Sequence, residues 1–184
     1  MTGVMEFIYM TKRMKINYII MMLIVLFDQI TKALAAKNQG ADRVIIPHLL
    51  TLGYMENSGA TYGIFCGSLF GRILLIVLPI IAIGVFLFYM HKYAKDSLFM
   101  TIGITMVVAG AIANLIDRVF LGYVIDFICM PFIGYMLDLI NVGNYYNNIA
   151  DISVFIGVFV FLIAFIVDEV KKGKTKAHAK NHLE

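Results

Sequence analysis

The sequence contains few of the residues with which proteins bind metals or phosphate groups. Its 184 residues include two cysteines and four histidines, and none of them follows a metal-ligand spacing. There is no glycine-rich phosphate loop and no low-complexity linker. Cys66 and Cys129 allow one disulfide without requiring it, and we favour small buried apolar residues as their role. The pattern therefore predicts no metal site.

Charged residues are also scarce, at 15% of the chain, and long stretches lack them entirely. The hydrophobic share is 61%, against roughly 45–50% in soluble domains, which indicates a membrane protein. A membrane-spanning helix needs about 20 mostly apolar residues. Because backbone polar groups in hydrocarbon must be satisfied within the segment, such stretches must be helical. We predict four transmembrane helices, at residues of about 17–36, 69–90, 97–116 and 152–170.

These helices are expected to form a single membrane domain over residues 1–172, followed by a basic tail at 173–184. The first stretch follows basic residues, as in a signal peptide, but it lacks a small-residue cleavage site and contains Asp28 and Lys32. We therefore expect it to be retained. Lysine and arginine are concentrated on the side that holds both termini, which predicts cytoplasmic termini. Contact with solvent and lipid explains the basic tail better than nucleic-acid binding does.

The two connections on the opposite side are longer than the cytoplasmic one. The first contains "RVIIPHLLTLGYMENSGATYGIF", whose β-branched and aromatic residues predict short strands at the membrane surface. Its turn signals are Pro47, Gly53 and Asn57-Ser58-Gly59. The second connection runs from about residue 117 to 150 and contains "FIGYMLDLI", a candidate interfacial amphipathic helix or turn.

Ionisable residues near membrane depth are rare and often mark function. Here all of them fall at the outer ends of the predicted spans: Asp28, Lys32, Asp117, Arg118, Asp126 and Asp151. Asp28 and Lys32 are four residues apart, so they share a helix face and can pair. An ion pair that only anchors the first span explains them equally well. Asn114 and Arg118 have the same spacing, and their donors suit them to binding loop carbonyls, which is a structural role.

Asp126 and Asp151 differ from these residues because neither has a basic neighbour in the sequence. Two unpartnered acids that enter the same membrane face are expected to meet each other. Two carboxylates that share a site cannot both ionise readily, so such a pair retains a proton and can activate water. The alternative is two separate helix caps, with Asp151 as the N-cap of the fourth span.

Four blocks of the sequence, in order from about residue 17 to 170, resemble lipoprotein signal peptidase (signal peptidase II), the bacterial membrane aspartyl protease. They are "DQITK", "ENSGATYGIF", "AGAIANLIDRVFLGYVIDFI" and "NNIADISVFIG". The resemblance implies an all-α polytopic membrane protein, with a four-helix bundle, a small extracytoplasmic β-cradle and an interfacial helix. It also implies removal of signal peptides from diacylglyceryl-modified prolipoproteins in the bacterial cytoplasmic membrane, with no metal or organic cofactor and no nucleic-acid partner.

The resemblance assigns catalysis to Asp126 and Asp151. It implies substrate-binding or pocket-supporting roles for a further set of matched positions: Asp28, Lys32, Asn57, Gly59, Gly110, Asn114, Arg118, Val124 and Asn148. The sequence departs from the family pattern where glycines are usual, at Ala109 and Ala113, and alanine still allows close helix approach. It also has Asn147 where the family usually has an aromatic residue, which changes the expected rim of the pocket.

Two other classes of function remain open from the residues alone. Intramembrane acids also serve as proton relays in transporters and channels, although the sequence has no evident inverted repeat. A non-catalytic scaffold would use the same acids as caps and ion pairs. The proteolytic interpretation rests on both candidate catalytic acids being present in their blocks.

Overall fold

The computed structural model describes residues 12–40, 42–59, 68–93, 97–132 and 146–181, with side chains described as far as residue 174. Four of its helices are long and apolar enough to cross a membrane. They are α2 (Lys12–Lys37), α3 (Leu69–Tyr93), α4 (Leu98–Phe120) and α6 (Ile149–Asn181). The four predicted spans are therefore confirmed, and the chain is a multi-pass membrane protein.

The helix bounds differ from the predicted ones where polar residues continue a helix. α4 extends through Asp117 and Arg118 to Phe120, so these residues form its last turn and not the start of a loop. α6 begins at Ile149, three residues earlier than expected, and continues through the predicted tail to Asn181. The candidate interfacial helix in "FIGYMLDLI" lies outside the described residues, except for Phe132.

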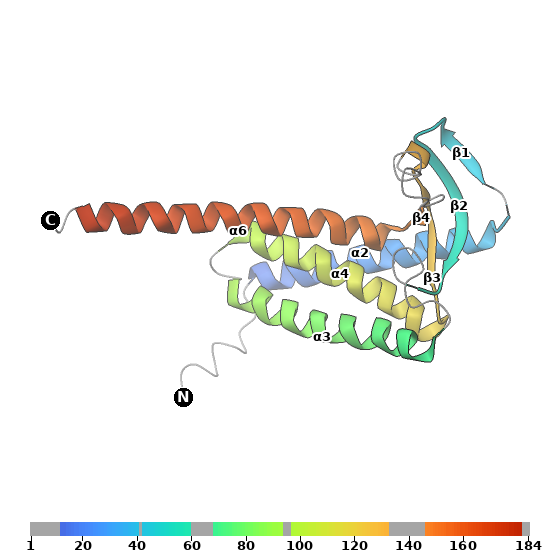
Figure 1. The fold of residues 1–184 in the computed structure, drawn as a ribbon, viewed down its shortest axis with the longest axis horizontal. Helices are drawn as coiled ribbons and strands as arrows, with labels where there is room; N and C mark the ends of the chain where they lie inside the picture. Colours follow the sequence, from blue (N-terminus) through green and yellow to red (C-terminus); the bar gives the residue numbers. More distant parts are fainter. Residues whose placement is uncertain (1–11, 41, 60–67, 94–96, 133–145, 182–184) are drawn as a thin grey trace.

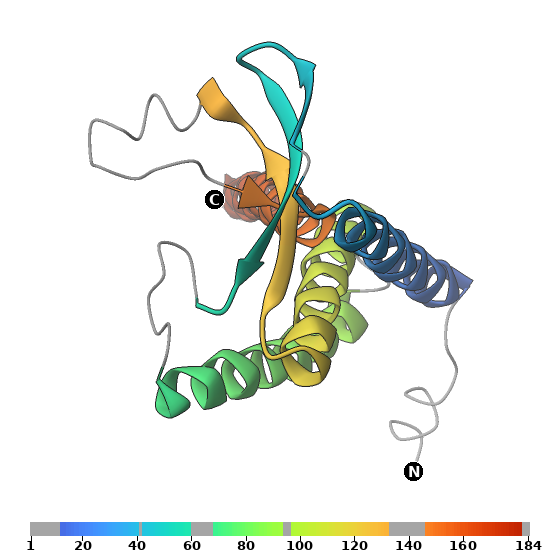
Figure 2. The same cartoon turned by 90° about the vertical axis from the view of Figure 1, so that its right-hand side faces the viewer.

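α4 is the central helix of the bundle and packs against α2, α3 and α6 (Figure 2). Its contact with α6 is the most extensive and relies on small residues. A Cβ added at Gly103 would collide with the backbone of Gly157, and one at Gly110 would collide with the carbonyl oxygen of Ala150. Both pairs of positions are seven residues apart along their helices, so they lie on one face. Small residues therefore let the two backbones approach closely.

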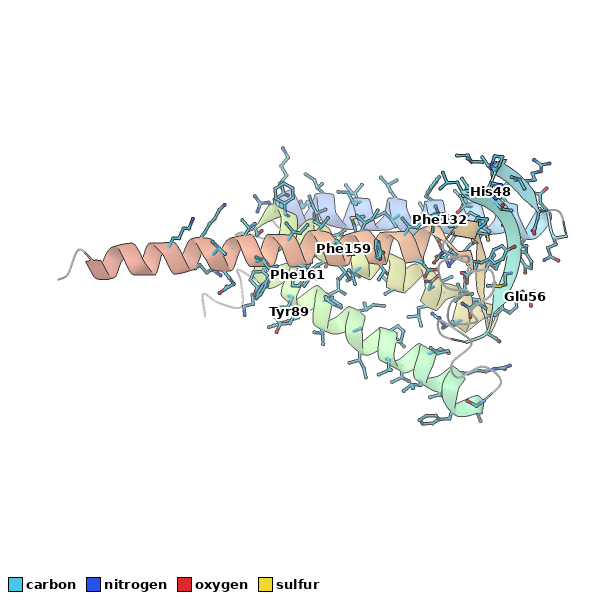
Figure 3. The ribbon with its side chains drawn as sticks, turned by 45° about the horizontal axis from the view of Figure 1, so that its top comes forward. His48, Glu56, Tyr89, Phe132, Phe159 and Phe161 are labelled. Atoms are coloured by element: carbon cyan, nitrogen blue, oxygen red, sulfur yellow. The ribbon has the colours of Figure 1, made fainter. Side chains whose placement is uncertain are left out.

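α3 is attached more loosely than the other helices. Its main neighbour in the described chain is α4, and it leans away from α6 toward one end of the bundle (Figures 1 and 3). Large apolar side chains cover its outer surface, in keeping with a lipid environment. Figure 3 shows Tyr89 of α3, with Phe159 and Phe161 of α6, far from the sheet that carries His48 and Glu56.

A four-stranded antiparallel sheet crosses one end of the bundle, which we call the sheet end (Figures 1 and 2). Its strands follow the order β1 (Arg43–Ile46), β2 (Leu50–Asn57), β3 (Val124–Cys129) and β4 (Tyr146–Asn147). Every residue of β3 is buried. The predicted short strands are thereby confirmed.

The turn signals in the first connection had mixed outcomes. Residues 47–49 form the β1–β2 turn, with His48 in the left-handed region at φ 61°. Asn57 Oδ1 accepts a hydrogen bond from the Gly59 backbone N–H at 3.2 Å, which makes the second predicted turn. The turn predicted at Gly53 is wrong, because Gly53 lies inside β2 at a shift of register. A side chain there would collide with the Asp42 carboxylate.

Candidate active site

Asp126 lies in the middle of the buried strand β3, opposite Met55 of β2. Its side chain accepts two hydrogen bonds from amides on different elements. Asn57, at the end of β2, donates from Nδ2 to Oδ2 at 3.0 Å. Asn148, just before α6, donates from Nδ2 to Oδ1 at 2.6 Å. The strand therefore presents this carboxylate to the junction of the sheet and the helices.

Asp151 lies in the first turn of α6 and also accepts two hydrogen bonds. Asn114 of α4 donates from Nδ2 to Oδ1 at 2.8 Å, and the Asn148 backbone N–H donates to Oδ2 at 3.2 Å. In return, Asn148 Oδ1 accepts from the Asp151 backbone N–H at 2.8 Å. This reciprocal pair is a capping box, and the Asn148 carbonyl accepts the first helical hydrogen bond, from Ile152. The alternative that made Asp151 the N-cap of this helix is therefore wrong, because Asn148 occupies that position.

Asn148 thus binds both candidate catalytic acids, one through its side-chain amide and the other through its backbone N–H. Its side chain is fully buried. A single residue fixed by its helix-capping role therefore holds the two carboxylates near each other. The Asp151 charge also acts on Asp126, 25 residues earlier in the chain, and the use of the two acids as a catalytic pair stays a prediction.

Burial is the largest effect on the Asp126 carboxyl and raises its pKa, because a charge is poorly solvated there. The neighbouring Asp151 carboxylate raises that pKa further, while the hydrogen bonds from Asn57 and Asn148 favour the ionised form and lower it. The net result is a pKa of about 7 for Asp126. The pair can therefore keep one proton close to neutral pH, as general acid–base chemistry requires.

A second polar cluster lies beneath the two acids and is centred on Lys32. Its ammonium group contacts Asp28 Oδ2 at 2.7 Å, Asp117 Oδ2 at 2.9 Å and Asn114 Oδ1 at 2.8 Å. The predicted Asp28–Lys32 pair is thereby confirmed. The buried ammonium group therefore forms ion pairs with two carboxylates and donates a hydrogen bond to one amide oxygen.

The two carboxylates of this cluster also hold the backbone next to the candidate catalytic acids. Asp28 Oδ1 accepts from the Ala150 N–H at 2.7 Å, one residue before Asp151. Asp117 Oδ2 accepts from the Ile125 N–H at 3.2 Å, one residue before Asp126. Lys32 therefore connects, through one carboxylate on each side, the two backbone segments that carry the pair.

The sequence did not reveal every member of this cluster. Asp117 was noted, but its pairing with Lys32 was not predicted, because the pair depends on how α2 packs against α4. Gln29 was missed altogether: its Nε2 donates to Asp117 Oδ1 at 2.9 Å and to the Ala113 carbonyl at 3.2 Å. An amide directly after Asp28 in an otherwise apolar span was the available signal.

The structure brings the other matched positions to the same end of the bundle. Val124 begins β3, buried, opposite Asn57 in the neighbouring strand. Gly110 lies at the α4–α6 contact beneath the first turn of α6. The Arg118 guanidinium is within electrostatic range of Asp151, Asp126 and Asp117. Asn147, where the family usually has an aromatic residue, is buried in β4 opposite Ile128.

Comparison with known proteins agrees with this geometry. The family model described as signal peptidase (SPase) II matches residues 20–167. The chain belongs to the signal peptidase II family. Lipoprotein signal peptidase from Clostridium novyi is 38% identical over 153 residues, which is 80% of this chain and 94% of that protein. The Streptococcus pneumoniae protein of the same name is 31% identical over 161 residues, 86% of this chain and 97% of that protein.

Solved structures support the same assignment at the level of the fold. A bacterial membrane enzyme determined by the in meso method at 2.3 Å resolution superposes with a TM-score of 0.72 at 33% identity. That match covers 86% of this chain and 92% of the other. A second such structure, at 1.9 Å resolution, gives a TM-score of 0.68 at 33% identity, over 82% and 92% of the two chains. This signal peptidase II is therefore a membrane peptidase of the aspartic class.

Proposed function

We propose that this signal peptidase II removes signal peptides from diacylglyceryl-modified prolipoproteins, with Asp126 and Asp151 as its catalytic residues. The observation that carries the proposal is the double contact of Asn148, which binds the Asp126 carboxylate through Nδ2 at 2.6 Å and that of Asp151 through its backbone N–H at 3.2 Å. This double contact supports the proposal, because aspartic proteases need two carboxylates close enough to share a proton.

The proposed reaction uses one water and one shared proton. The ionised carboxylate of the pair takes a proton from the water as the water attacks the carbonyl carbon of the scissile peptide bond. The neutral carboxyl donates its proton to the carbonyl oxygen, which gives a tetrahedral intermediate. As the C–N bond breaks, the proton taken from water passes to the departing amine, and a hydroxyl proton of the intermediate returns to the other carboxylate. This chemistry needs no metal and no organic cofactor. Its pH dependence belongs to the pair as a unit.

Substrate access is proposed from the membrane, at the sheet end. The sheet end would be extracytoplasmic and both termini cytoplasmic, in agreement with the distribution of lysine and arginine. The diacylglyceryl chains would lie in lipid against the bundle, and their burial would supply binding energy remote from the scissile bond. Arg118, Asn114 and the Asn57–Gly59 turn surround the pair and are the groups we assign to the substrate backbone.

A transporter or channel is less well supported by the same residues. A proton relay needs ionisable groups at successive depths of the membrane. In the described spans the carboxylates lie at the sheet end or, as with Asp168 and Glu169, near the opposite end of α6, with no acid between them. Together with the peptidase relatives, this distribution favours hydrolysis over transport.

The test is a cleavage assay with purified enzyme in detergent and a diacylglyceryl-modified prolipoprotein, followed by gel shift. The unlipidated precursor is the substrate control. We expect wild type to cleave only the lipidated form, and Asp126→Asn or Asp151→Asn to lower the rate at least about a thousandfold, as expected when a group that acts in the transition state is removed. Substantial cleavage by either variant, folded as judged by circular dichroism, would refute the dyad.

A further inference from the structure

A cavity of about 200 Å³ lies at the sheet end between the outer turns of α3 and α4. Its described lining consists of Ser58, Arg72, Leu75, Ile76, Arg118 and Gly122. Arg72 belongs to the first turn of α3 and Arg118 to the last turn of α4. The cavity therefore brings together two cationic side chains from neighbouring helices, at the sheet end of both.

Neither guanidinium forms a hydrogen bond or an ion pair with the described part of the chain. A guanidinium has five N–H donors, and burying them without acceptors is costly. Arg118 faces Asp151 and Asp126 electrostatically, but those carboxylates already accept hydrogen bonds from Asn57, Asn114 and Asn148. Among the described residues no acceptor is hydrogen-bonded to either guanidinium, so both can donate to a group that enters the cavity.

The chemistry of the lining selects an anion, and phosphate suits it best. Two guanidiniums can each bind phosphate oxygens in a bidentate manner. The described lining contains no carboxylate, so a headgroup with an ammonium group would find no partner there. This selects an anionic ligand over a zwitterionic one.

The position of the cavity indicates that the phosphate belongs to a lipid. Both arginines lie at the ends of membrane spans, where phospholipid headgroups are found. Leu75 and Ile76 form the apolar wall, and the same helix exposes Ile73, Val77 and Ile80. Acyl chains attached to a bound phosphate would therefore lie along α3, whose outer surface is free of packed neighbours in the described chain.

We propose that this cavity binds the phosphate of an anionic phospholipid through Arg72 and Arg118, with its acyl chains along α3. The site adjoins the proposed substrate-binding groups, with which it shares Arg118, whereas Arg72 belongs to the cavity and not to those groups. Lipid binding through Arg72 can therefore be measured without peptidase activity. A lipid held there would lie next to the proposed active site, because Arg118 lines the cavity and is also within electrostatic range of Asp126 and Asp151.

The test measures lipid retained on the purified protein by native mass spectrometry, with phosphatidylglycerol or phosphatidylcholine supplied at equal concentrations. Arg72→Gln removes one charge from the cavity without touching the catalytic pair. Arg43→Gln removes an exposed arginine from β1 at the same end of the molecule and is the matched control. We expect wild type to retain phosphatidylglycerol preferentially, Arg72→Gln to bind it about fivefold more weakly, and Arg43→Gln to resemble wild type.

Three results would overturn the proposal. Equal retention of the two lipids would remove the anionic preference, and equal losses in the two variants would reduce the effect to general surface charge. The third is a competition result in which inorganic phosphate displaces bound phosphatidylglycerol as effectively as added phosphatidylglycerol does. That result would show that the cavity binds free phosphate and not a lipid. Circular dichroism of Arg72→Gln must match wild type. A variant that fails this comparison is replaced by Arg72→Lys, which keeps the charge but loses the bidentate contact and is expected to bind phosphatidylglycerol more weakly than wild type. Unchanged binding by a folded Arg72→Lys would also contradict the proposal.

Discussion

At the scale of single residues, the protonation of Asp126 is set by opposing contacts. Burial and the Asp151 carboxylate raise its pKa to about 7, although Asn57 and Asn148 donate hydrogen bonds that favour the charged form. Desolvation is the stronger effect, because two neutral amides replace only part of the lost hydration. The pair is therefore expected to retain a proton until the pH passes about 7, and activity should decline above that value.

The Asn57 contact offers a test of this balance. Asn57→Ala removes the donor to Asp126 Oδ2, so the ionised form loses stabilisation and the pKa rises. We expect the alkaline limb of kcat/KM to move to higher pH by about one unit, roughly the effect of one hydrogen bond to a charged group. The measurement is cleavage of a lipidated peptide across a pH series.

Asn38→Ala is the matched control, because that amide lies at the same end and, within the described residues, donates to the Leu34 carbonyl at 2.7 Å and to neither proposed catalytic acid. Asn38→Ala should leave the alkaline limb of kcat/KM at the same pH as in wild type. A rate that falls equally at all pH values in Asn57→Ala would mean that Asn57 is structural and does not tune Asp126.

Asn148 caps α6 and also contacts both proposed catalytic acids, and two substitutions separate the effects of these contacts. Asn148→Ser keeps an oxygen for the helix cap but loses the Nδ2 donor to Asp126, so we expect near-native stability with strongly reduced cleavage. Asn148→Ala should lose both, with about 1 kcal/mol less stability. Thermal denaturation followed by circular dichroism, alongside the cleavage assay, checks both expectations.

Ser97→Ala provides the comparison for capping alone, since Ser97 caps α4 by accepting from the Met100 N–H at 3.3 Å. It should lose a similar amount of stability and keep its activity. Full activity in Asn148→Ser would contradict the bridging role of the side-chain amide.

Some of this site could be read from the sequence and some could not. Asp28 and Lys32 were predicted to pair because four residues bring side chains together on any helix. The capping box was also within reach, since Asn148 and Asp151 stand three apart before an apolar run. The contacts of Lys32 with Asp117 and Asn114 could not be predicted, because they depend on how α2 packs against α4 and join residues more than 80 positions apart in the chain.

At the scale of elements, hydrophobicity located the spans but not their ends. Apolar length predicted where each helix crosses the membrane. It placed the end of α4 too early, because Asp117 is a polar residue whose charge is satisfied inside the protein by Lys32 and Gln29. The sheet was predicted in outline, but its pairing with β3 required residues from a distant segment.

The contact of α4 with α6 gives the clearest prediction at this scale. Gly103→Ala places a Cβ against the backbone of Gly157 and Phe161, so one helix must shift, at a cost of about 1–3 kcal/mol. Because α6 carries Asp151, cleavage should fall as well. Unfolding in mixed micelles, followed by circular dichroism, measures the first effect.

Gly84→Ala in α3 is the control, because a Cβ there meets no atom within 4 Å. We expect no loss of stability, and helix propensity favours alanine slightly. Equal losses of stability in Gly103→Ala and Gly84→Ala would show that close packing of α4 against α6 does not explain the effect.

At the scale of the whole molecule, the sheet and the far end of α6 lie at opposite ends of the bundle (Figure 1). The orientation of the protein in the membrane can therefore be tested by labelling these two ends. The background variant replaces Cys66 and Cys129 by serine, and single cysteines are then introduced at Glu56, on the sheet, or Lys172, near the far end of α6. A membrane-impermeant maleimide should label Glu56→Cys in intact spheroplasts and Lys172→Cys only after permeabilisation. The reverse pattern would place the active site on the cytoplasmic side.

The hydrogen bond from Ala150 of α6 to Asp28 of α2 has a consequence for biosynthesis. Of the described spans, α2 leaves the ribosome first and α6 last, since synthesis runs from the N-terminal end. This hydrogen bond next to Asp151 forms only when the two helices meet. If Asp151 is catalytic, as proposed, we expect a nascent chain to be inactive until its last helix has been inserted.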